Sequence, residues 1–193
     1  MGFSCLMSTY KKDSPIQLKE CLESLVNQTL PADEIVLVKD GELSLELESV
    51  LEHYQDKLPF NFIELPNNKG LGNALNVGLL SCKYDIVIRM DADDICALNR
   101  FEIQYQFLSK NPEIDILGSW AWEINNQGKI VGERRYPENH EKLLELIWAC
   151  PINHPTVIYR RNKILSIGSY NIKIKRRQDY ELWFRAAENG LKF

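Results

Sequence analysis

The sequence has no excess of positive charge. Its 23 Lys and Arg residues are outnumbered by 27 Asp and Glu residues, which gives a net charge of −4. Because proteins that bind nucleic acids normally present a basic face, this balance argues against nucleic acid as a partner. A negatively charged ligand would have to be bound locally, by a metal ion, by individual Lys or Arg side chains, or by backbone amides.

The sequence also has no hydrophobic run that approaches the length of a membrane-spanning helix. A strand-like segment begins almost at the first residue, so we expect no signal peptide. With 45% hydrophobic and 26% charged residues, the 193-residue chain has the composition of an ordinary globular protein. We therefore expect a single domain, located in the cytoplasm.

Cysteine and histidine are few and scattered. The five cysteines include no C-x-x-C pair, and the three histidines do not have the spacing of zinc ligands. These features argue against a disulfide framework and a zinc cluster. We expect the cysteines to be reduced and mostly buried.

Strands and helices alternate through the first half of the chain. Short apolar runs predict buried strands at 3–8, 34–38, 59–65 and 84–90, and amphipathic patterns predict helices that start at Pro15, Leu43 and Leu71. This order predicts an α/β fold with a mostly parallel central sheet between two layers of helices. In the second half we expect these elements: a helix at 98–108, a hairpin of 114–122 and 129–136, a helix at 138–148, a strand at 156–160, a helix at 179–188, and a last strand from Leu191 that is cut short.

Three carboxylates follow the predicted strand at 84–90 directly, namely Asp91, Asp93 and Asp94. Asp40 likewise ends a predicted strand. In open α/β sheets ligands bind at the carboxyl ends of the strands, where carboxylates can hold Mg²⁺ or Mn²⁺ against a diphosphate. The alternative is a helix N-cap with solvated acids. Because converging carboxylates repel one another without a cation or hydrogen-bond donors, we favour a metal–diphosphate site and hence nucleotide chemistry.

The order of these segments resembles that of the family 2 glycosyltransferases, which are inverting enzymes with a GT-A fold and nucleotide-sugar donors. The resemblance rests on residues 6–10, 27–29, 35–41, 68–78, 91–94, 153–155 and 178–183. It implies a nucleotide-sugar-binding half at 1–96 and an acceptor-side half at 97–193 with a truncated C-terminus. It also implies a UDP-sugar donor and a saccharide or lipid-linked acceptor.

The resemblance assigns five positions to the nucleotide. Thr9 and Asp40 match residues that contact the nucleoside, and Asp91 matches the residue that reaches its ribose side. Gly72 and Asn73 match a segment that packs against the nucleotide, although a tight turn and a close-packed helix explain them equally well.

The metal and catalytic positions follow from the same resemblance. Asp93 matches the ligand of Mn²⁺ or Mg²⁺, and His154 matches a second metal or phosphate contact, with a purely structural histidine as the alternative. Asp179 matches the general base, with a helix N-cap as the alternative. Gln178 stands where many relatives carry Glu, so a role for that preceding acid is in doubt here.

Several features stay open at this level. Arg89 either orients the acids by an ion pair or simply ends its strand. The basic run 173–177 is solvated, closes on the diphosphate, or faces an anionic membrane. The four tryptophans belong to the core, or one of them stacks on a sugar ring.

The resemblance further implies bacterial surface-polysaccharide synthesis, such as that of O-antigen, lipooligosaccharide or capsule, and leaves open peripheral association with the inner face of the cytoplasmic membrane. Two other functions are kept as alternatives. A nucleotidyltransferase would show a Gly-rich loop with a basic residue after the first strand, and no such glycines follow Thr9. A catalytically silent nucleotide-sugar-binding domain would not need both Asp93 and Asp179.

Overall fold

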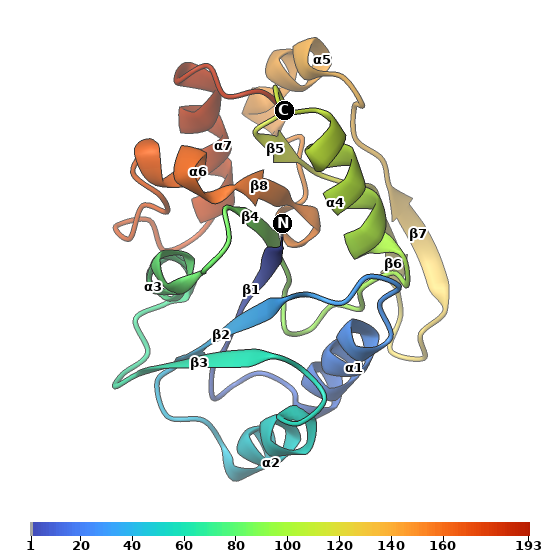
Figure 1. The fold of residues 1–193 in the computed structure, drawn as a ribbon, viewed down its shortest axis with the longest axis vertical. Coiled ribbons are helices and arrows are strands. Elements are labelled where there is room, and N and C mark those ends of the chain that lie inside the picture. The colour runs from blue at the N-terminus through green and yellow to red at the C-terminus, as the bar shows by residue number, and fades with distance from the viewer. Residues whose placement is uncertain (1) are drawn as a thin grey trace.

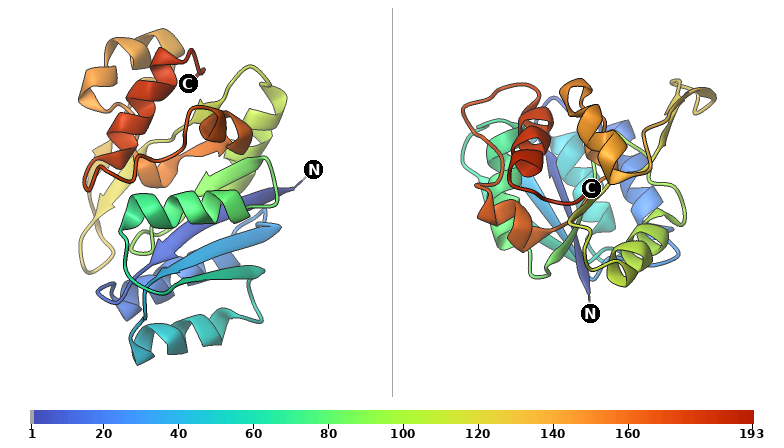
Figure 2. Two further views of the ribbon diagram at one scale, coloured as in Figure 1. Left: turned by 90° about the vertical axis from the view of Figure 1, so that its left-hand side faces the viewer. Right: turned by 90° about the horizontal axis from the view of Figure 1, so that it is seen from above.

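The computed structural model describes residues 2–193 and contains a six-stranded sheet with helices on both faces (Figures 1 and 2). The strands, in the order β3-β2-β1-β4-β8-β5, are β3 (Phe60–Leu65), β2 (Glu34–Asp40), β1 (Phe3–Thr9), β4 (Ile86–Arg89), β8 (Ile158–Arg160) and β5 (Ile116–Leu117). The first four are parallel, and β8 runs antiparallel to both β4 and β5. The mostly parallel sheet predicted from the sequence is confirmed.

Both faces of the sheet are buried, so the arrangement has three layers. Along β1, Cys5 and Met7 belong to one apolar core, and Leu6 belongs to the other, because successive side chains of a strand point to opposite faces. The core that contains Cys5 is covered by α1 (Pro15–Val26), α2 (Leu45–Tyr54) and α4 (Arg100–Lys110). The core that contains Leu6 is covered by α3 (Leu71–Ser81), α5 (His140–Glu145), α6 (Arg161–Ser166) and α7 (Gln178–Glu188).

Local sequence rules explain where several helices begin and how closely they pack. Ser14 caps α1 as predicted, with its Oγ accepting the backbone N–H of Gln17 at 3.4 Å. Helix α3 lies close to the sheet because residue 78 is glycine: a Cβ there would lie 2.5 Å from a methyl carbon of Leu6. Within residues 2–193, no helix combines the length and the apolar character that crossing a membrane requires.

The second half departs from the prediction in its pairing. The segment 114–122 is not one strand, because Ile116–Leu117 joins the main sheet beside β8 while only β6 (Ala121–Ile124) pairs with β7 (Ile130–Arg134) in the hairpin. The predicted helix at 138–148 is divided into α5 and the 3₁₀ turn η1 (Ile147–Ala149), and a second such turn, η2 (His154–Thr156), precedes β8. Helix α6, six residues long, follows β8 where the sequence pattern indicated no helix. Residues 191–193 form no strand, although the Lys192 carbonyl accepts the N–H groups of Asp115 and Ile116.

Candidate functional site

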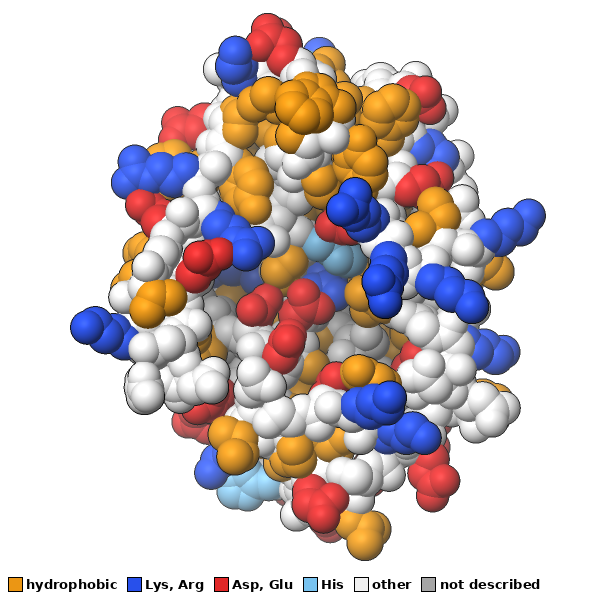
Figure 3. All heavy atoms as spheres, turned by 180° about the vertical axis from the view of Figure 1, so that it is seen from behind, with side chains coloured by type: hydrophobic (Ala, Val, Ile, Leu, Met, Phe, Trp, Pro, Cys, Tyr) orange, Lys and Arg blue, Asp and Glu red, His pale blue; other side chains and the backbone are white. Residues whose placement is uncertain are grey.

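An acidic group lies where β4 ends, beside the carboxyl ends of β1 and β2. One carboxylate oxygen from each of Asp91, Asp93 and Asp94 lies within 4.8 Å of the others. Figure 3 shows acidic side chains at the centre of a hollow on this face. Among residues 2–193 no other cluster of His, Cys, Asp and Glu has this geometry. The three acids therefore converge as the sequence predicts, and they include Asp94, to which the family resemblance assigns no individual role.

The charge on this group is poorly compensated. Partial burial, followed by the repulsion of Asp91 and Asp93, raises the pKa of Asp94 from 3.8 to about 6. Three carboxylates so close together are a suitable oxygen donor set for a hard cation such as Mg²⁺ or Mn²⁺. The residues present thus fit the metal that the sequence implied.

The raised pKa of Asp94 predicts a pH-dependent stability in the absence of metal. The folded state holds this proton more tightly than the unfolded state, so the contribution to stability is present at low pH and is lost as the pH rises from 3.8 through about 6. Because Asp94 is only partly buried and water screens its charge, we expect Asp94→Asn to raise Tm by only about 2–4 °C at about pH 8. This advantage should be lost at about pH 4. Thermal melts in EDTA at the two pH values test this. An equal shift at both would contradict it.

A buried arginine lies beneath the acidic group. Arg89 ends β4, is only 1% exposed, and forms an ion pair with Asp91 through its Nη2 atom. Its Nε and Nη1 atoms have no hydrogen-bond partner among the described residues. Of the two readings left open by the sequence, the structure favours the ion pair: Arg89 fixes the orientation of Asp91.

Because Arg89 is buried and Asp91 is partly exposed, removing Asp91 should destabilise the fold more than removing Arg89. Asp91→Asn would leave the buried guanidinium without its counter-charge, a situation that costs about 3–5 kcal/mol, or about 6–20 °C in Tm. Arg89→Met would leave Asp91, whose side chain is 32% exposed, in contact with water. We therefore expect this variant to lower Tm less than Asp91→Asn does. The double variant should be more stable than Asp91→Asn alone. Thermal melts test this, with exposed Asp93→Asn as the control. An equal decrease in Tm for Asp91→Asn and Asp93→Asn would contradict the conclusion that Asp91 is the counter-charge of Arg89.

Thr9, at the end of β1, binds a residue to which the sequence assigned no role. Its hydroxyl donates to Asp13 Oδ2 at 3.0 Å, and the Tyr10 backbone N–H donates to the same oxygen at 3.0 Å. Burial, and then the neighbouring Asp93 and Asp91, raise the pKa of Asp13. Asp13 thus belongs to the site, but no motif marked it, because it lies in an ordinary loop after β1.

Asp40 shapes the turn that precedes α3. It is buried, and its two oxygens accept the backbone N–H groups of Lys69 at 2.7 Å and Gly70 at 2.9 Å. Gly41 makes this approach possible: its φ is +87°, and a Cβ there would lie 2.7 Å from the Asn68 nitrogen. Asp40 therefore positions backbone donors at the sheet edge, a role that the sequence did not predict.

A cavity of about 350 Å³ adjoins this turn. Gly72 and Asn73 line it from α3, and Gln178 lines it from the start of α7. The remaining lining residues are Asn68, Lys69, Gly70, Ile172, Ile174 and Lys175. The structure thus brings together three sequence segments, 68–73, 172–175 and Gln178, around one space of a size suited to a small ligand.

His154 is not a member of the acidic group, and its ring is bound to a tyrosine. Its side chain is buried, and its Nε2 atom lies 2.9 Å from the Tyr170 hydroxyl. Burial, and then the charge of Arg89, lower the pKa of His154 well below its usual value, so the ring is neutral. A metal role for His154 stays a prediction, and the hydrogen bond to Tyr170 accounts for it as a structural residue.

Asp179 lies in the first turn of α7, and its partner is a cysteine. The Cys150 thiol lies 3.8 Å from Asp179 Oδ2. Burial, and then the charge of Asp179, raise the pKa of Cys150 to about 12. The thiol therefore stays protonated and donates a hydrogen bond to the carboxylate. The N-cap of α7 is Arg177 rather than Asp179. The alternative role of Asp179 as the cap is therefore not observed. The five cysteines are free and four of them are buried, as predicted, while Cys150 is half-buried beside Asp179.

Comparisons with known proteins agree with this geometry. The family model described as "Glycosyl transferase family 2" matches residues 4–179. The chain is 41% identical to the amylovoran biosynthesis glycosyltransferase AmsE of Erwinia amylovora, over 97% of this chain and 70% of that one. It is 38% identical to the Escherichia coli UDP-Gal:alpha-D-GlcNAc-diphosphoundecaprenol beta-1,3-galactosyltransferase, over 97% of this chain and 68% of the relative.

The fold is also similar to a solved structure. TarS of S. aureus superposes with a TM-score of 0.78 at 23% identity, over 96% of this chain and 33% of TarS. A structure of TarS 1–349 in complex with UDP-GlcNAc gives a TM-score of 0.76 at 24% identity, over 96% of this chain and 53% of that one. The chain thus spans between a third and about half of these structures, and the likeness concerns the fold.

Proposed function

Because the chain belongs to glycosyl transferase family 2 and has its GT-A fold, we propose that it moves a sugar from a UDP-sugar to a hydroxyl group of a saccharide or lipid-linked acceptor in bacterial surface-polysaccharide synthesis. The observation that carries the proposal is the convergence of the Asp91, Asp93 and Asp94 carboxylates directly after β4, in a sheet of this family's fold. The names of the E. coli and Erwinia relatives support the UDP donor, the lipid-linked acceptor and the polysaccharide product.

In this proposal the donor binds mainly to residues 1–96 and the acceptor approaches from residues 97–193. Thr9 and Asp40 contact the nucleoside, Gly72 and Asn73 pack against it from the cavity wall, and Asp91 reaches the ribose. The support for this arrangement is that Asp40 fixes the 69–70 turn, while Gly72 and Asn73 line the cavity that the turn adjoins.

Asp93, together with Asp91 and Asp94, would hold Mn²⁺ or Mg²⁺. Such an ion acts as a Lewis acid that stabilises the negative charge developing on a diphosphate leaving group. The role of the chain is to keep three carboxylates converged, with Arg89 fixing the innermost of them, Asp91. His154 stays at most a contact to the phosphates, since its Nε2 is bonded to Tyr170.

Asp179 would take the proton from the acceptor hydroxyl as general base. Its position at the start of α7, one residue after a side chain that lines the cavity, supports this role. Attack from the face opposite the leaving diphosphate inverts the anomeric centre, so an α-linked donor would give a β-linked product. The thiol of Cys150 donates to Asp179 Oδ2 and would hold the carboxylate in place.

Turnover with defined substrates tests the proposal. The chain is incubated with Mn²⁺, a panel of UDP-hexoses and UDP-N-acetylhexosamines, and a GlcNAc-diphospholipid acceptor, and the product linkage is determined by NMR. We expect UDP release together with a β-linked product. In a parallel incubation with UTP and a sugar phosphate, release of pyrophosphate would instead identify a nucleotidyltransferase. Binding of a UDP-sugar without turnover would identify a catalytically silent binding domain.

We also propose that the protein works at the inner face of the cytoplasmic membrane, as a peripheral protein. The lipid-linked acceptor in the name of the E. coli relative supports this location.

A further inference from the structure

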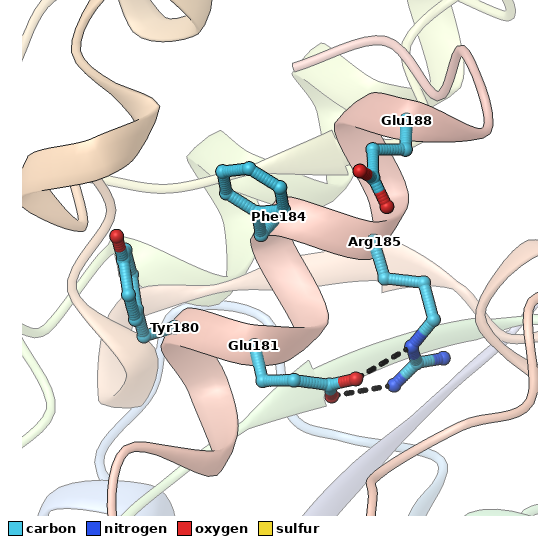
Figure 4. A pocket seen from close by; sticks show the side chains of 5 residues that line it. All are labelled: Tyr180, Glu181, Phe184, Arg185 and Glu188. Carbon is cyan, nitrogen blue, oxygen red and sulfur yellow. Dashed lines mark hydrogen bonds and ion pairs between the residues drawn. The ribbon is translucent and has the colours of Figure 1, made fainter.

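Three aromatic side chains cover the outer surface beside the proposed base. Trp148 of η1 is 68% exposed and Phe184 of α7 is 42% exposed. Tyr180 lies between them along the chain, one residue after Asp179, and its hydroxyl donates to the Trp148 carbonyl at 2.9 Å. Figure 4 shows Tyr180 and Phe184 on the same side of α7. We call Trp148, Tyr180 and Phe184 the aromatic patch.

Two of the three charged side chains next to this patch, Glu181 and Arg185, are paired with each other, and the third, Glu188, is exposed further along α7. Glu181 and Arg185 form an ion pair at 2.8 Å, and Arg185 also donates to Glu181 through its Nε atom at 3.0 Å (Figure 4). A sugar-binding surface combines an aromatic ring with polar groups that are available to the hydroxyls of the ligand. Here Glu181 and Arg185, which lie closest to Asp179 and Tyr180 in sequence, are engaged with each other, so we consider the patch better suited to hydrocarbon than to a saccharide.

A cluster of positive charge borders the aromatic patch. Lys173, Lys175, Arg176 and Arg177 are all exposed on the loop that leads into α7. Cys150, two residues after Trp148, donates to Asp179, two residues after Arg177, at 3.8 Å. The end of this loop therefore lies next to the segment that carries Trp148. Figure 3 shows apolar side chains gathered at the top of this face and blue Lys and Arg side chains between them and the acidic hollow.

We infer that the aromatic patch and the basic loop together form the surface by which the protein docks on an anionic lipid bilayer. Aromatic side chains with polar edges favour the interface between hydrocarbon and water, and clustered Lys and Arg are attracted to anionic headgroups. Their charge complementarity to such a surface is what selects this partner over a second copy of the chain. The inference rests on the proposed function and deepens it, since docking here places Asp179 beside the membrane that carries a lipid-linked acceptor.

Vesicle binding by the 193-residue chain tests this inference. The chain is mixed with phosphatidylcholine vesicles, with or without phosphatidylglycerol, and the bound fraction is measured by flotation. We expect binding only to the anionic vesicles and weakening with added salt. The variant Trp148→Ala/Phe184→Ala should bind about tenfold more weakly, as should Lys173→Glu/Arg176→Glu. The control is Trp122→Ala, which removes a tryptophan that is 62% exposed on the distant β6–β7 hairpin.

Two further measurements, UDP affinity and the oligomeric state in solution, distinguish a failure of this inference from a failure of the proposed function. All aromatic variants should keep wild-type affinity for UDP and remain folded by circular dichroism, because these side chains lie on the outer surface. No binding to anionic vesicles, equal binding to neutral ones, or an equal loss with Trp122→Ala would overturn the inference. The inference would also be overturned if sedimentation showed a dimer that Trp148→Ala/Phe184→Ala dissociates, because the partner would then be a second copy of the chain. It would equally be overturned if this variant changed only the KM for a water-soluble saccharide acceptor, because the patch would then bind sugar.

Discussion

Asp179→Asn is expected to lower kcat for sugar transfer by about 10²–10⁴-fold, the range that a positioned general base contributes. The affinity for UDP should stay unchanged, because Asp179 lies outside the acidic group and does not line the cavity. Asn keeps an oxygen that can accept the Cys150 thiol, so the start of α7 should be preserved. Steady-state kinetics and UDP titrations on the same preparation measure the two effects.

A second acid on the same helix provides the control for Asp179. Glu188 is exposed near the end of α7, and Glu188→Gln makes the same chemical change outside the proposed site. We expect it to retain wild-type turnover. If Asp179→Asn retained turnover as well, the base would have to be another group.

Asp93→Asn is expected to weaken the binding of Mn²⁺ in the presence of UDP by about 100-fold or more, since even outer-shell partners of a metal site change affinity by about 10–100-fold. Asp93 is an exposed member of the three-carboxylate group and has no ion-pair partner among the described residues, so its charge is available to a cation. Electron paramagnetic resonance of free Mn²⁺ measures the binding directly, without relying on turnover.

The control for this substitution is an exposed aspartate elsewhere on the surface. Asp56 lies just after α2, and Asp56→Asn should leave the Mn²⁺ affinity unchanged. Loss of turnover in Asp93→Asn with undiminished Mn²⁺ binding would remove this residue from the metal site.

The first half of the fold could be predicted because its signals are local. Buried parallel strands such as β1 and β2 are short apolar runs, and Ser14 marks the start of α1 within one turn. The second half depends on contacts between distant residues. Ile116–Leu117 leaves the predicted hairpin because it pairs with β8, about forty residues later, and the Thr156 hydroxyl accepts the N–H of Ser119 beside it.

The residues of the site likewise include some that the sequence predicts and some that depend on contacts between distant residues. Asp91, Asp93 and Asp94 are close in sequence and follow one strand, so their convergence could be predicted from the sequence. The role of Asp13 beside Thr9 depends on how a loop folds back, and the contact of Cys150 with Asp179 joins residues 29 positions apart. The neutral, Tyr170-bound state of His154 likewise follows from burial, which a single sequence motif does not report.

Calorimetric titration of the 193-residue chain with UDP, in Mn²⁺ and then in EDTA, tests the central claim most directly. We expect UDP to bind only when the metal is present, and GDP to bind much more weakly under the same conditions. Failure of UDP to bind in Mn²⁺, or equal binding in EDTA, would contradict the proposal that the acidic group at the end of β4 is the metal-dependent donor site of a UDP-sugar transferase.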